Sequence, residues 1–347
     1  MPKTQFPRKF TLKPFDLDAA HRCQEHWDSR GKPPGSLGQL EEALVQIAGI
    51  TGEAGGALKP CRLLVFCADN GVARRGVSVV GGEVTAALGR SLANGRLAVC
   101  QMATVAGVEV TPVDMGVDWE RPPAGFIPLS LGRGTADLSQ GPAMTPEHAL
   151  QGIDQGVSVT KAAVEQGARL LLAGEVGIGN TTSAAAMTAV LLGLEVETIT
   201  GQGAGLPPER IPDKVEIIKQ AIRVNHPDPS NPLDVLAKIG GFDLAGLTGM
   251  FIACAELGVP VVLDGLISTV AALTAERLCP GARQAMLASH LSTEPAARLV
   301  LWELGLEPVV QARLRLGEGS GAVTLVPLLD MARQAYHGMD AYTDLVP

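Results

Sequence analysis

Short apolar runs that alternate with longer helical stretches constrain the fold of this 347-residue chain more than any other feature. The runs lie at 63–68, 107–113, 168–173, 261–263 and 285–289. Most of them are apolar at consecutive positions, which is typical of strands covered on both faces. The helical stretches between them would provide right-handed crossover connections. The pattern therefore predicts an α/β fold built on a parallel sheet.

Both ends of the chain have helical patterns without a strand. Helices are expected at 17–29 and 38–49, with Ser36 placed to cap the second, and at 321–337. We expect residues 51–320 to form a large α/β domain, and residues 1–50 with 321–347 to form a small helical domain. The expected architecture is a parallel Rossmann-like sheet with flanking helices and this small domain from both termini.

Composition argues against several classes of partner and site. The net charge of −8 and the lack of a dense Lys/Arg run argue against a nucleic-acid partner. The apolar runs are too short to span a membrane. Six scattered cysteines, and a start at residues 1–5 unlike a secretion signal, indicate reduced thiols in a cytoplasmic protein. The histidines form no zinc-type grouping, so we expect no metal.

A glycine-rich segment at 174–186 joins a predicted strand to an alanine-rich helix expected at 183–192. Its glycines, Gly174, Gly177 and Gly179, allow a tight turn that directs backbone N–H groups toward one point. The positive end of the helix dipole lies near that point, so the segment resembles an anion cradle. Glu175 would repel a phosphate and suits a sugar hydroxyl or a developing positive charge.

The spacing of this segment narrows what it could bind. A P-loop is excluded because Asn180, not lysine, follows Gly179. A dinucleotide fingerprint would need glycine or alanine where Thr182 stands, although Glu195 and Glu197 lie at a plausible distance for a ribose-binding acid. The segment is therefore a phosphate cradle, a degenerate dinucleotide site or a tight turn without a ligand.

Polar residues follow several of the predicted strands. Asp69, Glu175 and Asp264 each come directly or nearly directly after a strand, and His290, Ser292 and Glu294 follow the last one. A single such acid could simply cap the next helix. Because the carboxyl ends of parallel strands share one edge of a sheet, their coincidence predicts a common pocket there.

Two further glycine-rich segments fit the same pocket. The segment 201–206 precedes a helix that contains Lys214, which could supply the positive charge missing from the first cradle. The segment 314–322 places Glu318 among small residues. A carboxyl group on a turn in an apolar pocket can have a raised pKa and act as a general base, but Glu318 could equally be a solvated turn residue.

Motifs in the same order along nearly the whole chain resemble the nicotinate-nucleotide:dimethylbenzimidazole phosphoribosyltransferase family. They lie at 32–38, 69–72, 76–78, 83–85, 174–185, 263–265, 289–290, 294–296 and 315–322. The resemblance implies transfer of phosphoribose from nicotinate mononucleotide to 5,6-dimethylbenzimidazole, which gives α-ribazole 5′-phosphate and nicotinate for the cobalamin lower ligand. It also implies a six-stranded parallel sheet, a helical domain from both chain ends, and a homodimer with active sites near the subunit interface.

The resemblance assigns roles to individual residues and implies no cofactor or metal. Glu318 would take the proton of the benzimidazole N–H. Glu175 and Asp264 would bind ribose hydroxyls or stabilise positive charge at C1′. The residues expected to hold the 5′-phosphate are Gly177, Gly179, Asn180, Gly203, Lys214 and Ser292. Further substrate-binding residues are expected to be Asp69, Ser78, Thr181 and Leu316.

Two departures from the family pattern leave the accepted base open. Gly82 stands where the family usually has glutamine, and Asn70 replaces a usual histidine. Both belong to the region that lines the base pocket in the family, so a related base is an alternative substrate. The alternative functions are a nicotinamide-nucleotide-dependent oxidoreductase, which Thr182 weakens, and a non-catalytic nucleotide-binding protein, in which Glu318 would be dispensable.

Overall fold

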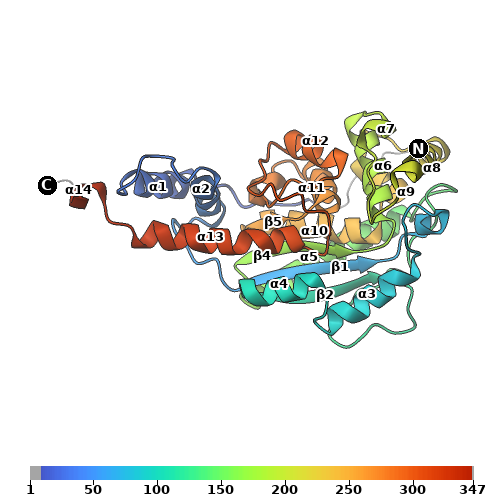
Figure 1. Cartoon of the computed structure of the whole chain (residues 1–347), viewed down its shortest axis with the longest axis horizontal. Helices are drawn as coiled ribbons and strands as arrows, with labels where there is room; N and C mark the ends of the chain where they lie inside the picture. The colour runs from blue at the N-terminus through green and yellow to red at the C-terminus, as the bar shows by residue number, and fades with distance from the viewer. Residues whose placement is uncertain (1–8, 346–347) are drawn as a thin grey trace.

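The computed structural model describes residues 9–345, which form a six-stranded parallel sheet flanked by helices (Figure 1). The strand order is β3-β2-β1-β4-β5-β6. The strands are β1 (Cys61–Ala68), β2 (Val108–Gly116), β3 (Ile127–Pro128), β4 (Leu170–Val176), β5 (Val261–Leu263) and β6 (Met286–Ala288). The expected fold class is therefore confirmed. Residues 1–8 and 346–347, used in the expectations about a signal and the terminal domain, lie outside the described residues.

The sheet is accompanied by α-helices and three short 3₁₀ helices. The α-helices are α1 (Leu17–Asp28), α2 (Gln39–Thr51), α3 (Glu83–Ala93), α4 (Ala98–Ala106), α5 (Pro146–Glu165), α6 (Asn180–Leu192), α7 (Val196–Ile199), α8 (Ile211–Asn225), α9 (Pro232–Ile239), α10 (Phe242–Leu257), α11 (Leu266–Leu278), α12 (Pro295–Leu304), α13 (Ser320–Gly338) and α14 (Tyr342–Leu345). The 3₁₀ helices are η1 (Gly71–Arg75), η2 (Pro208–Arg210) and η3 (Ala282–Ala285). Between residues 9 and 345, no helix has the length and apolarity needed to cross a bilayer.

The two faces of the sheet are buried under different sets of helices. Leu64 and Phe66 of β1 point into a core shared with α5, α6, α10 and α11. Leu63 and Val65, which alternate with them, point into a second core shared with α2, α4 and α13. Successive side chains of a strand point to opposite faces, so burial on both faces requires continuous apolarity. This is the physical reason for the unbroken apolar runs in the sequence.

The structure corrects the expected bounds around the glycine-rich segment. Strand β4 ends at Val176 rather than at 173, and α6 begins at Asn180 rather than at 183. Gly174 and Glu175 are consequently strand residues, because pairing of β4 with β1 continues as far as Cys67 and Val176. The long connection at 114–145 also contains strand β3, which pairs with Val113 and Asp114.

The expected cap of α2 was wrong. The helix begins after Gly38, and the backbone N–H of Ser36 donates to the carbonyl of Pro33 at 3.2 Å within a turn. Among the described residues, no side chain caps the helix. Glu41 instead holds the turn before it, because its Oε1 accepts from the backbone N–H of Leu37 at 2.8 Å and from Lys32 Nζ at 2.7 Å. The proline-rich turn delays the start of the helix beyond the reach of Ser36.

Helices from both chain ends lie together beside the sheet (Figure 1). Helix α2 packs on α1 and on α13, while the start of α13 packs on α4 and β4. Helix α13 therefore runs continuously from the sheet into the terminal helices. The division into domains at 51–320 and at 1–50 with 321–347 stays a prediction.

Glycines allow α5 and α10 to cross in close contact on one face of the sheet. A Cβ atom at Gly156 of α5 would lie 2.0 Å from the carbonyl oxygen of Gly246, and one at Gly249 of α10 would lie 2.0 Å from that of Ile153. Both neighbours are backbone atoms, which cannot move aside without shifting a helix. This crossing matters for the site because the first turn of α10 carries Asp243, a fully buried carboxyl group.

Substituting Gly156→Ala should lower the free energy of unfolding by about 1–3 kcal/mol, because overpacking outweighs the gain of up to about 1 kcal/mol in helix propensity. Chemical denaturation would measure the change. Gly141→Ala is the matched control, since a Cβ there would meet no atom within 4 Å. Equal stability of the two variants would contradict the close crossing.

Candidate functional site

A cavity of about 720 Å³ opens at the carboxyl ends of the strands. The two central strands of the sheet are β1 and β4. From β1 the chain continues to β2 on one side, and from β4 it continues to β5 on the other. Loops after two such strands diverge and leave a crevice between them. The lining residues come from 80–88, 175–181, 203–205, 264–267, 290–294 and 313–318.

Most of the predicted site residues meet in this cavity. Those that line it are Glu175, Gly177, Asn180, Thr181, Gly203, Asp264, Ser292, Leu316 and Glu318. Their segments are far apart in sequence, and the parallel sheet brings them to one edge. The shared pocket expected from the strand ends is therefore present, while the role of each residue stays a prediction.

Glu318 occupies a turn of three successive residues in the left-handed region. Gly317, Glu318 and Gly319 have φ values of 84°, 63° and 88°. Glycine adopts this conformation readily, but a glutamate there is strained. Such strain persists only where the surrounding structure imposes it, and it is typical of functional sites.

Asp264, directly after β5, holds this turn. Its Oδ2 accepts from the backbone N–H of Gly319 at 3.2 Å, and its Oδ1 accepts from those of Gly321 and Ala322 at 2.7 and 3.3 Å. These groups begin α13, where a negative charge is favoured by the helix dipole. The Asp264 carboxylate thus caps a helix that lies 55 or more residues further along the chain.

The carboxyl group of Glu318 lies at the start of another helix. Its Oε2 accepts from the backbone N–H of Val99 in the first turn of α4 at 3.3 Å. Burial raises the pKa of Glu318, the bond from Val99 opposes this effect, and the charge of Asp264 adds to it. A raised pKa brings the carboxyl closer to the range in which a general base is effective near neutral pH.

Glu175 is buried at the end of β4 beneath the cavity. Its Oε2 accepts from Asn180 Nδ2, and the same nitrogen donates to Asp243 Oδ2 at 3.0 Å. Burial, followed by the charge of Asp243, raises the pKa of Glu175 well above its ordinary value. Both amide hydrogens of Asn180 are therefore occupied by carboxyl groups, which leaves its carbonyl oxygen to face other partners.

Lys214 lies behind the cavity wall formed by Thr181 and Gly203. Its Nζ donates to Thr181 Oγ1 at 3.0 Å and to the carbonyl of Gly201 at 3.1 Å. Burial lowers the pKa of Lys214 to about 8, although the charge of Glu294 raises it. Gly203 has a φ of 54°, and a Cβ there would lie 3.1 Å from Lys214 Nζ, so glycine keeps the approach to the ammonium group open.

Three other predicted residues lie around the cavity rather than in its described lining. Asp69 lines a second cavity of about 520 Å³ and accepts from the backbone N–H of Asp118 at 2.7 Å. The hydroxyl of Ser78 accepts from the backbone N–H of Val80 at 3.4 Å. Gly179, with a φ of 97°, forms the N-cap of α6.

Helix α3 separates the two cavities. Val84 and Leu88 line the main cavity, whereas Glu83 and Arg90 line the second. A Cβ at Gly82 would lie 3.5 Å from Asp69 Oδ1. The space left by Gly82 therefore opens toward Asp69 and the second cavity, and the wall of the main cavity at this point is aliphatic.

Several lining residues were given no role from the sequence. His290 and Glu294 were noted as following a strand and as parts of family motifs, without a role. Both line the cavity, and Glu294 Oε1 accepts from the backbone N–H of Gly203 at 2.8 Å. Arg313 and Arg315 line its exposed rim. Asp243 was missed entirely. The usable signal was Gly240 and Gly241, which precede a helix with an acid in its first turn.

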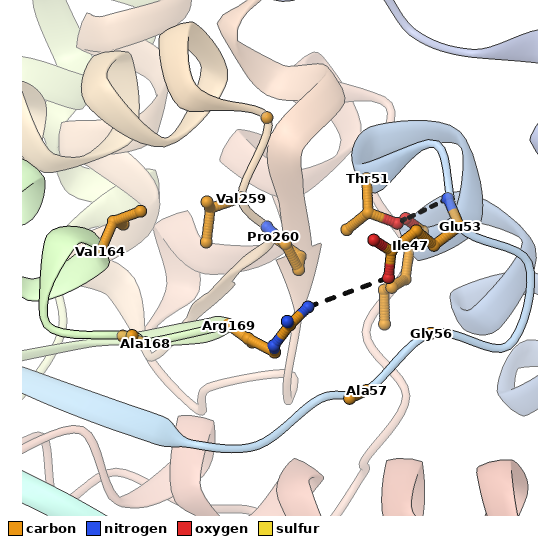
Figure 2. Close-up of a pocket in the computed structure, with 12 residues that line it drawn as sticks. Ile47, Thr51, Glu53, Gly56, Ala57, Val164, Ala168, Arg169, Val259 and Pro260 are labelled. Carbon is orange, nitrogen blue, oxygen red and sulfur yellow. Dashed lines mark hydrogen bonds and ion pairs between the residues drawn. The ribbon is translucent and has the colours of Figure 1, made fainter.

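A further cavity, of about 280 Å³, lies at the opposite, amino-terminal ends of the strands (Figure 2). Arg169 precedes β4 there and pairs with Glu53 at 3.8 Å. Both side chains are more than half exposed, so the pair contributes little to stability. The buried carboxyl groups and Lys214 lie at the other edge of the sheet, which makes the larger cavity the candidate site.

Comparisons with known proteins identify the family of this chain. A family model described as phosphoribosyltransferase matches residues 12–344. The nicotinate-nucleotide–dimethylbenzimidazole phosphoribosyltransferase of Ruminiclostridium cellulolyticum is 39% identical over 96% of this chain and 95% of its own length. The enzyme of the same name from Salmonella arizonae is 41% identical over 93% of this chain and 92% of its own length.

A solved structure gives the same result for the fold. The crystal structure of CobT from Thermus thermophilus superposes with a TM-score of 0.89 at 38% sequence identity, covering 94% of this chain and 98% of that one. The matches support the family expected from the sequence and give no support to the oxidoreductase alternative. The chain therefore belongs to the nicotinate-nucleotide–dimethylbenzimidazole phosphoribosyltransferase family.

Proposed function

We propose that this protein transfers the 5-phosphoribosyl group of nicotinate mononucleotide to 5,6-dimethylbenzimidazole or a related base, giving α-ribazole 5′-phosphate and nicotinate. The family membership supports the reaction. The main structural support for the mechanism is the position of the Glu318 carboxyl group. It lies at the cavity on a strained turn, and its pKa is raised.

The chemical step needs a base and no acid. One nitrogen of the benzimidazole attacks C1′ of the ribose while its other nitrogen gives its proton to the Glu318 carboxylate. The bond between C1′ and the pyridinium nitrogen breaks, and its electron pair stays with that nitrogen. Because the pyridinium is already cationic, nicotinate leaves without protonation. Attack opposite to the leaving group inverts C1′ and turns a β-nucleotide into an α-nucleotide.

The cavity has a polar end and an aliphatic side that suit the two substrates. Gly177, Gly203 and Ser292 lie at the polar end, with Lys214 directly behind them. Lys214 makes two hydrogen bonds within residues 9–345, and an ammonium group has three hydrogens, so one can serve a phosphate oxygen. We place the 5′-phosphate here.

The aliphatic side suits the base. Val80, Val84, Leu88 and Leu316 line it, and flat apolar walls favour an aromatic ring with methyl substituents. Between the two ends, Glu175 would bind a ribose hydroxyl as a neutral acid. The charge of Asp264 would stabilise positive charge at C1′ while it holds the turn of Glu318.

We also propose that the protein is a homodimer in the cytoplasm. The exposed side chains of Val79 and Leu316 lie near the cavity rim, and apolar groups on such a rim are typical of surfaces that a partner covers. All six cysteines are free thiols, as in a reducing compartment. Light scattering tests the assembly, because a monomer has a mass of 36.0 kDa and a dimer twice that value.

Substituting Glu318→Gln should lower kcat by about 100-fold or more, the scale expected for losing a general base, with little change in affinity for nicotinate mononucleotide. The wild-type rate should fall as the pH drops through the raised pKa of Glu318, because the base must be ionised. Turnover is measured by mass detection of the nucleotide product. Glu209→Gln, at an exposed position on η2, is the control. Near-native turnover in Glu318→Gln would remove Glu318 from this role.

Substituting Lys214→Ala should raise KM for nicotinate mononucleotide by about 10- to 100-fold, because a charge-assisted phosphate contact contributes about 1.5–3 kcal/mol. The KM for the base should change little. In the wild type, kcat/KM for the nucleotide should also decline as the pH rises through about 8, where the buried ammonium group loses its proton. Equal weakening of both substrates would count against the phosphate assignment.

Substituting Leu88→Ala should reduce the preference for 5,6-dimethylbenzimidazole over unsubstituted benzimidazole, since methyl contacts in an apolar pocket contribute about 1–3 kcal/mol. Competition between the two bases measures the ratio of specificity constants directly. Leu299→Ala, on the surface of α12, serves as the control. An unchanged ratio would show that the methyl groups lie elsewhere.

A further inference from the structure

A buried chain of hydrogen bonds links α10 to Glu175, which packs against the turn that carries Glu318. Asp243, in the first turn of α10, accepts from Asn180 Nδ2 through Oδ2 at 3.0 Å. Asn180 Nδ2 also donates to Glu175 Oε2. A side-chain amide nitrogen has two hydrogens, so the two carboxyl groups use both of them. This arrangement fixes Asn180 and Glu175 relative to α10.

The far side of Glu175 packs against the turn itself. A Cβ atom at Gly317 would lie 2.6 Å from Glu175 Oε1, and one at Gly174 would lie 2.8 Å from the carbonyl oxygen of Glu318. The strand end and the turn thus touch without any intervening side chain. A change in the position of Glu175 would therefore displace the backbone beside Glu318.

We propose that Asp243 is a positioning residue that acts through Asn180 to hold Glu175 against the turn that carries Glu318. The inference rests on the proposed function, because Glu318 is the base of that reaction. Asp243 itself accepts a further bond from the backbone N–H of Leu244 at 3.0 Å. It is fully buried and lies outside the described lining of the cavity, so its influence on the reaction is indirect.

The charges around Glu175 are consistent with this role. The titratable groups that face it are Asp243 from α10, Asp264 after β5, Glu318 before α13 and Cys67 from β1. Burial and the three carboxyl groups raise the pKa of Glu175, and the bond from Asn180 only partly offsets them. Burial raises the pKa of Asp243 to about 6. These effects favour the neutral form of Glu175 at a pH where an ordinary glutamate is ionised.

A neutral Glu175 has a consequence for the base. A second negative charge close to Glu318 would raise the pKa of Glu318 further and reduce the fraction that is ionised. A protonated Glu175 avoids this and can donate its hydroxyl to a substrate oxygen. By raising the pKa of Glu175, the charge of Asp243 favours a neutral neighbour beside the catalytic carboxylate.

The test is Asp243→Asn, which removes the charge and keeps an acceptor for Asn180. We expect kcat to fall by about 10- to 100-fold, the scale of a slight misplacement of a catalytic group, with both KM values within about twofold. Loss of the charge lowers the pKa of Glu175. The neutral form of Glu175 then persists only to a lower pH. The alkaline decline of kcat, measured at saturating substrates, should therefore begin at a lower pH than in the wild type.

Asp18→Asn, in the exposed first turn of α1, is the matched control and should leave the profile unchanged. A uniform loss of kcat with an unshifted pH profile would mean that Asp243 is merely structural, and the proposal would be wrong. Unchanged kcat would overturn it as well. If the wild type shows no turnover with nicotinate mononucleotide and any base, the proposed function fails. A second measurement, which does not depend on turnover, then tests the present inference alone.

That second measurement is the ¹³C carboxyl titration of Glu175 in protein labelled at glutamate, with the resonance identified by its loss in Glu175→Gln. In the wild type Glu175 should ionise well above the ordinary glutamate pKa, and in Asp243→Asn it should ionise at lower pH than in the wild type. Ionisation of wild-type Glu175 near the ordinary glutamate pKa of about 4.3 would overturn the proposal even if Asp243→Asn does not fold.

Discussion

The hydrogen bonds between Asp264 and the start of α13 are the constraint on which the rest of the site depends. The carboxylate follows β5 directly, and three backbone N–H groups of another segment converge on it. Without this acceptor, the first turn of α13 would have buried donors without partners, and the left-handed turn at 317–319 would relax. The parallel pairing of β5 with β4 fixes Asp264 relative to Glu175. The sheet thereby sets the position of Glu318, although Glu318 belongs to no strand.

The site places several carboxyl groups close together and gives each a different environment. Asp264 accepts hydrogen bonds from backbone donors at a helix start, and Asp243 accepts from Asn180 and the N–H of Leu244. Within residues 9–345, Glu175 accepts a bond from the amide of Asn180 and is surrounded by negative charge, which raises its pKa. Glu318 receives one bond from the start of α4 and lies at the cavity. Such separation of pKa values among neighbouring acids is how one site can contain both a base and a neutral hydrogen-bond donor.

The sequence predicted the fold and the location of the site because both depend on local patterns. Continuous apolar runs indicated strands buried on two faces, and glycines around Glu318 indicated an unusual turn. Other features depend on tertiary contacts that no local pattern contains. Gly174 was expected to lie in a turn, but it is a strand residue that is small because the Glu318 carbonyl packs on it. Which cavity the space beside Gly82 faces depends on how α3 is oriented between the two cavities. Asp243 was missed because it acts through Asn180, whose own side chain was expected to face a phosphate.

In the proposed reaction the base attacks C1′ from the side opposite to nicotinate, with Glu318 next to the attacking base. The configuration of the product at C1′ tests this most directly. Purified protein would be incubated with nicotinate mononucleotide and 5,6-dimethylbenzimidazole, and the nucleotide product isolated for NMR analysis of its anomeric proton and of the contacts of that proton across the ribose ring. Direct displacement with inversion at C1′ predicts the α-nucleotide alone. A β-nucleotide, or a mixture of the two anomers, would contradict direct displacement at this site.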